Sequence, residues 1–102
     1  MAINNSGRYD EVDEDSYVMG TISVSTTAVE AKVGANRLDG RQSLIIFNAS
    51  TANLYYGTTG VTTTTGIPIF PTQMMTLSIG DIPILLIAAT TGPYTAVIHE
   101  VS

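Results

Sequence analysis

The side chains that could perform chemistry near neutral pH are few in this sequence, and they are not grouped into a site. His99 is the single histidine, and histidine is the side chain that shuttles protons in this pH range. No second histidine and no cysteine accompanies it, and the neighbouring Glu100 would point to the opposite face of a strand. General acid–base catalysis needs a positioned partner for the proton. We therefore expect His99 to have a structural or interface role, and we predict no catalytic residue and no enzymatic activity.

An acidic run close to the first residue is the other cluster of titratable groups. Its carboxylates are Asp10, Glu11, Asp13, Glu14 and Asp15. A calcium-binding EF-hand loop needs carboxylates at alternate positions, then a glycine and a distal glutamate, and the run lacks both that glycine and that spacing. Blocks of like charge are typical of interaction tails. Residues 1–16 are therefore predicted to form an extended acidic arm that contacts a partner, and no metal or other cofactor is predicted.

Tyrosines beside turns form the remaining candidate site. Tyr55 and Tyr56 precede the sequence GTTG at 57–60, and Tyr94 follows a second turn. No lysine follows GTTG, so this segment predicts a hairpin turn and not a phosphate-binding loop. Exposed tyrosines near loops can form a platform that binds sugars or proteins. They can also cap a core with their hydroxyl groups at its rim, and the sequence leaves both roles open.

Strands would position these residues, because the sequence from Tyr17 onward has the pattern of β-structure. Runs of β-branched, aromatic and alternating apolar residues are separated by turn residues about every 8–12 positions, which predicts about seven or eight strands. The apolar runs at 43–47 and 82–89 predict buried strands, the first of them buried on both faces. We expect an all-β fold, a single small β-sandwich or jelly-roll-like barrel over residues 17–102. The residues predicted to fill its core are Leu44, Ile46, Leu77, Ile84, Leu86 and Val97.

The threonine-rich segment VTTTTG at 61–66 has no clear partner in this pattern. Consecutive threonines favour extended backbone, so the segment is either an exposed edge strand or a loop. Pro68 lies in the next apolar run and cannot donate a ladder hydrogen bond, which predicts an edge position for that run.

The composition restricts the partners of the protein. Charged residues make up 13% of the 102 residues, about half of the usual share, so the surface is either kept soluble by Thr, Ser and Asn or covered by partners. The net charge of −5 comes mainly from the acidic run. Clustered Lys and Arg are absent, which argues against nucleic acid. No apolar run reaches the roughly 20 residues of a membrane-spanning helix, and no signal-peptide pattern is present, so we expect a protein made in the cytoplasm.

The sequence from Arg41 to Val101 resembles the small β-sandwich proteins of tailed bacteriophage virions. In those proteins a strand ending in an Asn-Ser turn precedes a Tyr-x-Gly hairpin, a Gly-x-Pro-Ile/Leu-x-Pro connection and a final strand ending in Glu. The residues that carry the resemblance are Arg41, Asn48, Ser50, Tyr56, Gly57, Gly66, Pro68, Ile69, Pro71 and Glu100. Thr72 stands where such proteins usually have a glycine. The acidic arm has no counterpart in them.

The resemblance implies a structural protein of the virion, without catalytic residues. The leading hypothesis is a capsid decoration protein that binds the outer shell as a symmetric homo-oligomer, expected to be a trimer, with the major capsid protein or another virion protein as its partner. A head-fibre, neck or tail component is the first alternative. The second is a carbohydrate-binding or receptor-binding module that uses Tyr55, Tyr56 and Tyr94. A cupin-type enzyme would need several histidines and a carboxylate around a metal, which one histidine does not supply.

Overall fold

The computed structural model describes residues 17–102. This part of the chain contains eight β-strands, joined by turns and loops, and no helix. The predicted arm, with Asp10, Glu11, Asp13, Glu14 and Asp15, lies outside the described residues. The strands are β1 (Tyr17–Val24), β2 (Val29–Glu30), β3 (Ser43–Asn48), β4 (Leu54–Gly57), β5 (Ile67–Ile69), β6 (Met74–Leu77), β7 (Leu85–Ala88) and β8 (Tyr94–Val101). This number agrees with the turn spacing in the sequence.

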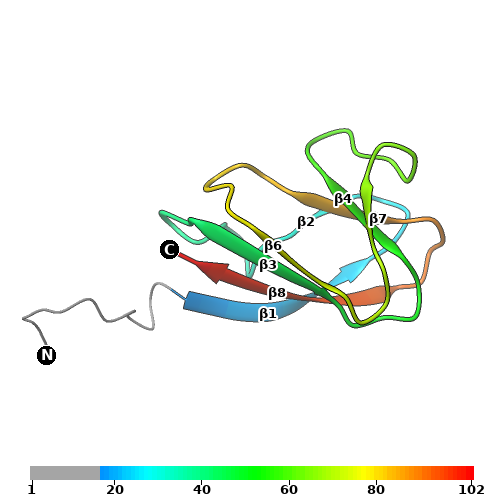
Figure 1. Ribbon diagram of the computed structural model, residues 1–102, viewed down its shortest axis with the longest axis horizontal. Helices are drawn as coiled ribbons and strands as arrows, with labels where there is room; N and C mark the ends of the chain where they lie inside the picture. The colour runs from blue at the N-terminus through cyan, green and yellow to red at the C-terminus, as the bar shows by residue number, and fades with distance from the viewer. Residues whose placement is uncertain (1–16) are drawn as a thin grey trace, which may run out of the picture.

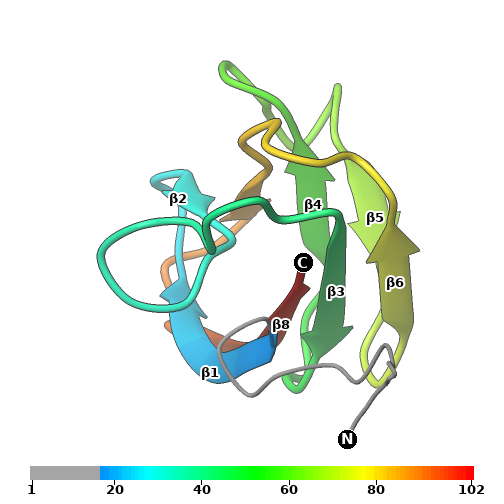
Figure 2. The ribbon, with the colours of Figure 1, turned by 90° about the vertical axis from the view of Figure 1, so that its left-hand side faces the viewer.

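The strands form two four-stranded antiparallel sheets that face each other (Figures 1 and 2). Sheet A has the strand order β1-β8-β3-β6, and sheet B has the order β2-β7-β4-β5. The longest ladder joins β1 to β8, from the pair Tyr17 and Val101 to the pair Val24 and Tyr94. The predicted all-β class is confirmed. Pro68 lies in β5, which is an edge strand of sheet B, as its missing N–H group requires.

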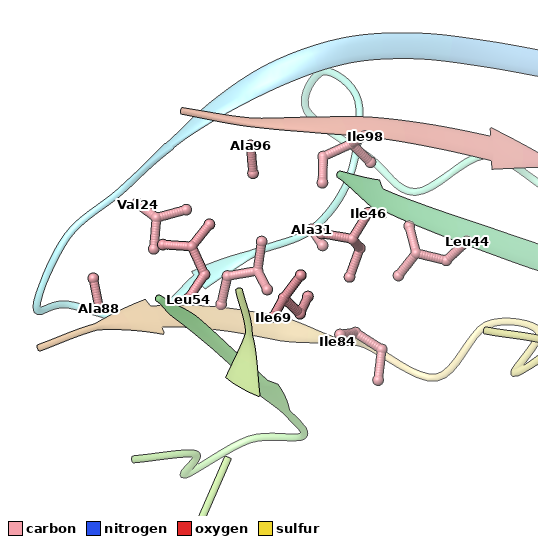
Figure 3. Close-up of a cluster of buried hydrophobic side chains, with 11 residues drawn as sticks. Val24, Ala31, Leu44, Ile46, Leu54, Ile69, Ile84, Ala88, Ala96 and Ile98 are labelled. Atoms are coloured by element: carbon pink, nitrogen blue, oxygen red, sulfur yellow. The ribbon is translucent and has the colours of Figure 1, made fainter. Parts of the chain in front are cut away.

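The core lies between the two sheets and is filled by aliphatic side chains from both (Figure 3). Four predicted core residues, Leu44, Ile46, Ile84 and Leu86, belong to it, whereas Leu77 is partly buried and packs against its border. The buried members are Val24, Ala31, Leu44, Ile46, Leu54, Ile69, Ile84, Leu86, Ala88, Ala96 and Ile98. Burial of such side chains contributes most of the favourable free energy of folding.

Val97 does not belong to the core, so that prediction was wrong. In β8 the inward positions are Ala96, Ile98 and Glu100, and Val97 and His99 point to the outer side of sheet A. Both faces of β8 carry apolar residues, so alternation alone does not decide which one points inward. Because Glu100 is charged, the sequence pattern suggests that its side of β8 faces solvent, although that side faces the core.

The two continuous apolar runs were also predicted to be more deeply buried than they are. In β3, burial alternates, with Leu44 and Ile46 buried and Ile45 and Phe47 partly exposed. In the second run only Leu85–Ala88 forms a strand, and burial alternates there as well. A sheet covered on one side gives this alternation, and the apolar residues on its other side remain available for contact.

The threonine-rich segment is a closed loop between β4 and β5. The hydroxyl oxygen of Thr62 accepts hydrogen bonds from the backbone N–H groups of Thr64 and Thr65, and its carbonyl oxygen accepts one from Gly66 at 2.8 Å. A Cβ atom at Gly66 would lie 2.8 Å from the Cβ of Tyr55, so only glycine fits there. Local side-chain hydrogen bonds of this kind compete with strand pairing, which explains why consecutive threonines form a turn here.

Thr72 has a φ of 64°, the one positive value among the non-glycine residues that the structure describes. This is a backbone conformation that glycine favours and that other residues rarely adopt. The N–H of Thr72 donates to the carbonyl of Asn48 at 2.9 Å, which fixes the turn against the end of β3. A left-handed conformation costs a residue other than glycine roughly 1–2 kcal/mol.

Thr72→Gly is therefore expected to raise the free energy of unfolding by about 0.5–1 kcal/mol, after the greater flexibility of glycine in the unfolded chain is subtracted. The matched control is Thr63→Gly, at an exposed loop position whose φ is not positive, where we expect a loss of similar size. Thermal unfolding followed by circular dichroism gives both values. A fall in the midpoint for Thr72→Gly would mean that the side chain of Thr72 stabilises the turn.

Candidate functional site

The exposed charges of the described residues gather at one corner of the fold. Glu30, Lys32, Arg37, Asp39 and Asp81 line a single hollow there, together with Asn36 and Leu38. The Nη1 of Arg37 lies 2.8 Å from a carboxylate oxygen of Glu30, and the Nζ of Lys32 lies 3.8 Å from the other. Lys32 also donates to the carbonyl of Ala35. Because both cations are already paired, this corner is suited to holding the loops together more than to capturing a charged ligand.

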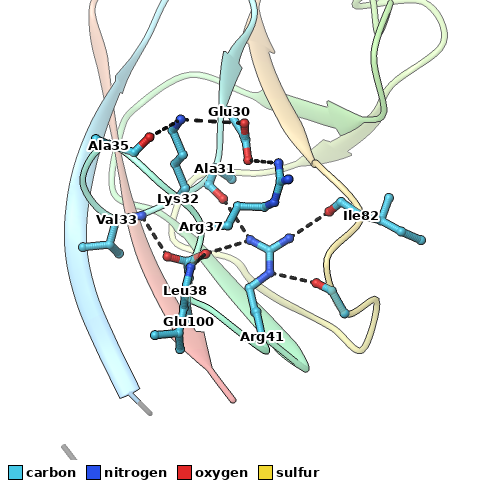
Figure 4. A network of polar contacts seen from close by, with 11 residues as sticks. Glu30, Ala31, Lys32, Val33, Ala35, Arg37, Leu38, Arg41, Ile82 and Glu100 are labelled. Carbon is cyan, nitrogen blue, oxygen red and sulfur yellow. Dashed lines mark hydrogen bonds and ion pairs between the residues drawn. The ribbon is translucent and has the colours of Figure 1, made fainter. Parts of the chain in front are cut away.

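The other two charges, Arg41 and Glu100, form a buried ion pair. The Nη1 of Arg41 lies 2.8 Å from Oε2 of Glu100, and neither side chain is exposed to solvent. Arg41 also donates to three backbone carbonyl oxygens, those of Gly80, Ala31 and Ile82 (Figure 4). The guanidinium group is planar and rich in donors, which suits it to joining several acceptors at one point.

Glu100 completes this network from β8. Its Oε1 accepts the N–H of Val33 at 3.0 Å, and its Oε2 accepts the N–H of Leu38 at 3.3 Å (Figure 4). The pair thus joins the β2–β3 connection and the β6–β7 connection to the last strand. All these contacts are internal, so the role is structural. The pairing of Arg41 with Glu100 was not predicted from the sequence, where the signal for it was a lone carboxylate at an inward strand position.

Asn48 is the third buried polar side chain, at the end of β3. Its Nδ2 donates to the carbonyl oxygens of Ala52 and Ile69, each at 2.8 Å. Its Oδ1 accepts the N–H of Ser50 at 3.0 Å and the hydroxyl of Ser50 at 2.6 Å. Every hydrogen-bonding group of the amide is satisfied. Asn48 therefore holds the β3–β4 connection against β5 and is not available to a ligand.

His99 lies on the outer side of sheet A, and Glu100 lies on the inner side, as the sequence predicts. The Nδ1 of His99 is 2.6 Å from the hydroxyl oxygen of Tyr17, and the two rings meet edge to face with centroids 5.4 Å apart. The imidazole lines a hollow of about 370 Å³ whose other members are Tyr17, Ile45, Phe47, Met74 and Val97. These lining residues include no carboxylate, and apart from the Tyr17 hydroxyl and the imidazole the hollow offers apolar contact.

The three tyrosines are not brought together. Tyr94 lines a hollow of about 570 Å³ with hydroxyl-bearing residues that include Ser50 and Thr90, and its hydroxyl is hydrogen-bonded to that of Thr90. Tyr56 packs against the core and lines a different hollow with the turn at 58–61. These hollows lie at opposite ends of β4, because the connection that precedes this strand borders the first and the turn that follows it borders the second. Tyr55 points to the outer side of sheet B, opposite Pro68.

The outer side of sheet A has no formal charge at any strand position, and we call it face A. Three rows of paired residues cross it, and each row runs over β1, β8 and β3. Its members are Tyr17, Met19, Thr21, Ser23, Ser43, Ile45, Phe47, Met74, Thr76, Thr95, Val97, His99 and Val101. Met19 is 68% exposed and Met74 is 64% exposed. Large exposed apolar areas of this kind mark contact surfaces.

Other kinds of site find no support in residues 17–102. In that part of the chain no three His, Asp or Glu side chains are arranged to hold a metal ion. Nor does it contain a helix with the length and apolar character of a transmembrane segment. No protein-family model matches the chain, and no curated protein matches it. Face A is therefore the strongest candidate for a functional surface among the described residues.

Proposed function

We propose that the protein is a structural component of a virus particle, a capsid decoration protein that binds the outer shell as a symmetric homo-oligomer, expected to be a trimer. The observation that carries the proposal is the distribution of charge. Outside the corner lined by Glu30, Lys32, Arg37, Asp39 and Asp81, the described surface has no formal charge. The chain acts through shape and contact, and the partner is another protein surface.

A surface with so few charges favours association over isolation. Monomeric domains usually carry charges of both signs over about a quarter to a third of their surface, which keeps them apart. The centres of protein interfaces are depleted in charged residues because each buried charge must lose its hydration. In this protein the threonine-rich loop 61–66 and the strands of face A provide neutral surface of that kind.

The strand order supports the same proposal by analogy. The sequence of strands in sheets A and B, β1-β8-β3-β6 and β2-β7-β4-β5, is that of an eight-stranded jelly roll. Jelly rolls occur in viral capsid proteins, lectins and cupins. Fold alone does not assign function. The analogy agrees with the resemblance of residues 41–101 to bacteriophage virion proteins, and the structure of the described residues offers no metal site of the cupin kind.

A decoration protein would act mechanically. Each copy needs only weak contacts with the shell, because several copies joined in one oligomer bind together with a much higher overall affinity. The acidic residues 10–15 are proposed to supply contacts to the shell or to an adjacent copy. Such contacts across capsomer boundaries would hold neighbouring capsomers together and resist internal pressure.

The proposal is tested with purified particles and the full-length protein. We expect antibody labelling to find the protein on the outer surface of the head, at a regular copy number. Deletion of residues 1–16 is expected to leave the β-type circular dichroism unchanged and to abolish binding to particles that lack the protein. Particles without the protein should also lose integrity at a lower temperature. Absence of the protein from intact particles would contradict the proposal, and full binding by the truncated chain would exclude the acidic segment as the anchor.

A further inference from the structure

We propose that face A is an interface between copies of this chain, so that the partner that covers it is a second copy of the protein. The inference deepens the proposed function, since it rests on a homo-oligomer and assigns the surface through which two copies meet. Copies that meet through the same face are related by a two-fold axis, so the contact assigned is that of a dimer in place of the expected trimer. It concerns contact between copies only, and the surface that meets the shell lies elsewhere on the molecule.

The first support is the shape of face A, which combines an apolar hollow with exposed methionine side chains. The hollow is lined by Ile45, Phe47, Val97 and the exposed Met74 of edge strand β6. The exposed Met19 lies on the other edge strand, β1, where it pairs with His99, another lining residue. Methionine side chains are flexible and adapt to the surface against which they pack. A surface with an apolar depression and exposed methionines can pack against the equivalent surface of a second copy, with the methionines of one copy near the hollow of the other.

The second support is charge. Face A has no charged group to attract an oppositely charged partner, and two copies of it meet without like-charge repulsion. The acidic segment of the same chain is a poor occupant. Its carboxylates would lose hydration on a surface without Lys or Arg, and that loss would not be offset. A second copy brings the same apolar residues and hydroxyl groups, so both partners lose little on dehydration.

The third support is size. Four strands about 4.8 Å apart and up to eight residues long give face A an area on the order of 500 Å². Two copies in contact would bury about 1,000 Å² in total, which is the lower limit for a specific interface. Contact between side chains of neighbouring loops adds to this area. We therefore expect moderate affinity between isolated copies, strengthened when the oligomer is fixed on a repeating shell.

The test measures self-association of the full-length chain by sedimentation velocity over about 1–100 μM, a range that covers moderate affinities. We expect the wild-type chain to form a defined oligomer. Met19→Glu combined with Met74→Glu should weaken self-association by about 100-fold or more, because each copy would bury two carboxylates without partners. The matched control is Ile67→Glu, since Ile67 is 53% exposed but lies on β5 of sheet B. This control should associate like the wild type.

A second measurement does not depend on how the charged variants fold. The chain has no cysteine, so a single introduced cysteine reports on one position. Thr21→Cys lies on face A, and Thr63→Cys lies in the loop between β4 and β5. Alkylation of the first thiol should slow at least about tenfold between dilute and concentrated protein, as expected when association buries it. Alkylation of the second should not change.

Three results would overturn the inference: a wild-type chain that stays monomeric throughout this range, a double glutamate variant that associates normally, or a Thr21→Cys thiol that reacts at the same rate at every concentration. None of these results would remove the protein from the virus particle. Conversely, a chain that associates through face A but is absent from particles would contradict the proposed function and leave the interface standing.

Discussion

Arg41→Met is expected to lower the free energy of unfolding by about 3–5 kcal/mol, the usual cost of removing one member of a buried ion pair. The carboxylate of Glu100 would remain in a site without solvent, and its cationic partner would be gone. Two carbonyl oxygens, those of Gly80 and Ile82, would lose donors that lie 2.9 and 2.8 Å away. Domains of this size have only on the order of 5–15 kcal/mol of stability. Urea unfolding followed by circular dichroism measures the loss.

Arg37→Met is the matched control, because the structure contains a second Arg–Glu pair with the same separation. The distance from Arg37 to Glu30 is 2.8 Å, as it is from Arg41 to Glu100, but the side chains of Arg37 and Glu30 remain 35% and 22% exposed. Exposed ion pairs contribute about 0–1 kcal/mol. We therefore expect Arg37→Met to cost less than about 1 kcal/mol. Equal losses in the two variants would show that burial is not the source of the effect.

The double variant Arg41→Met, Glu100→Leu asks whether the pair can be replaced by apolar packing. In several proteins such a replacement restores or raises stability. Here the N–H groups of Val33 and Leu38 donate to the carboxylate, and they would lose this partner at a partly buried position. Each unpaired buried group costs about 1–3 kcal/mol. We expect the double variant to stay at least about 2 kcal/mol below the wild type. Full recovery would mean that the backbone contacts of this pair are dispensable.

The strands could be predicted from the sequence, but the side of the sheet that each residue faces could be predicted only in part. In β6 the period-two alternation of the sequence puts Met75 and Leu77 on one side, and in the structure both pack against the core. The same rule failed for β8, where Val97 and Ile98 lie on opposite faces of similar apolar character. Alternation reveals a buried face only when the other face is polar. A protein that uses both faces of a sheet, one for its core and one for contact, removes that difference.

The candidate functional surface could not be derived from the sequence, because it is made by pairing between distant strands. Tyr17 and His99 are 82 positions apart, and Arg41 and Glu100 are 59 positions apart. Their local sequence gives no sign of the partner. The composition did indicate that a contact surface exists, since a chain with few charged residues has a surface that is either neutral and polar or covered by partners. Only the register of β1, β8 and β3 identifies face A as the place where neutral side chains gather.

Three buried polar side chains hold the β2–β3, β3–β4 and β6–β7 connections in place, where few apolar groups do so. Arg41, Asn48 and Glu100 make the contacts that a backbone ladder would make in a strand. The β3–β4 connection, which Asn48 holds, contains no charged residue, whereas the connections held by Arg41 and Glu100 carry the exposed charges of the corner. Under the proposed function, an ordered neutral connection of this kind would meet a neighbouring copy at a small cost in entropy.

Asn48→Asp is expected to lower the free energy of unfolding at neutral pH by about 3–5 kcal/mol, although it changes the shape of the side chain very little. The amide nitrogen that now donates to the carbonyls of Ala52 and Ile69 would become an oxygen. An oxygen facing two acceptors at that distance is repelled, and the new carboxylate would be buried without a cation. The loss should appear in urea unfolding as a lower midpoint with an unchanged slope.

The pH dependence of this variant separates repulsion from simple misfit. Burial and acceptor neighbours raise the pKa of the introduced carboxyl in the folded state above the value near 3.9 of an unfolded chain. A group with a raised folded pKa destabilises least below the unfolded value and most above the folded one. The deficit relative to the wild type should therefore shrink as the pH falls from 7 toward 4. Ser50→Ala, which removes the hydroxyl contacts to Oδ1 of Asn48 and to the backbone of Ala52, should cost about 0.5–1.5 kcal/mol at every pH. A deficit of Asn48→Asp that is independent of pH would mean that the buried amide is held by shape and not by its hydrogen bonds.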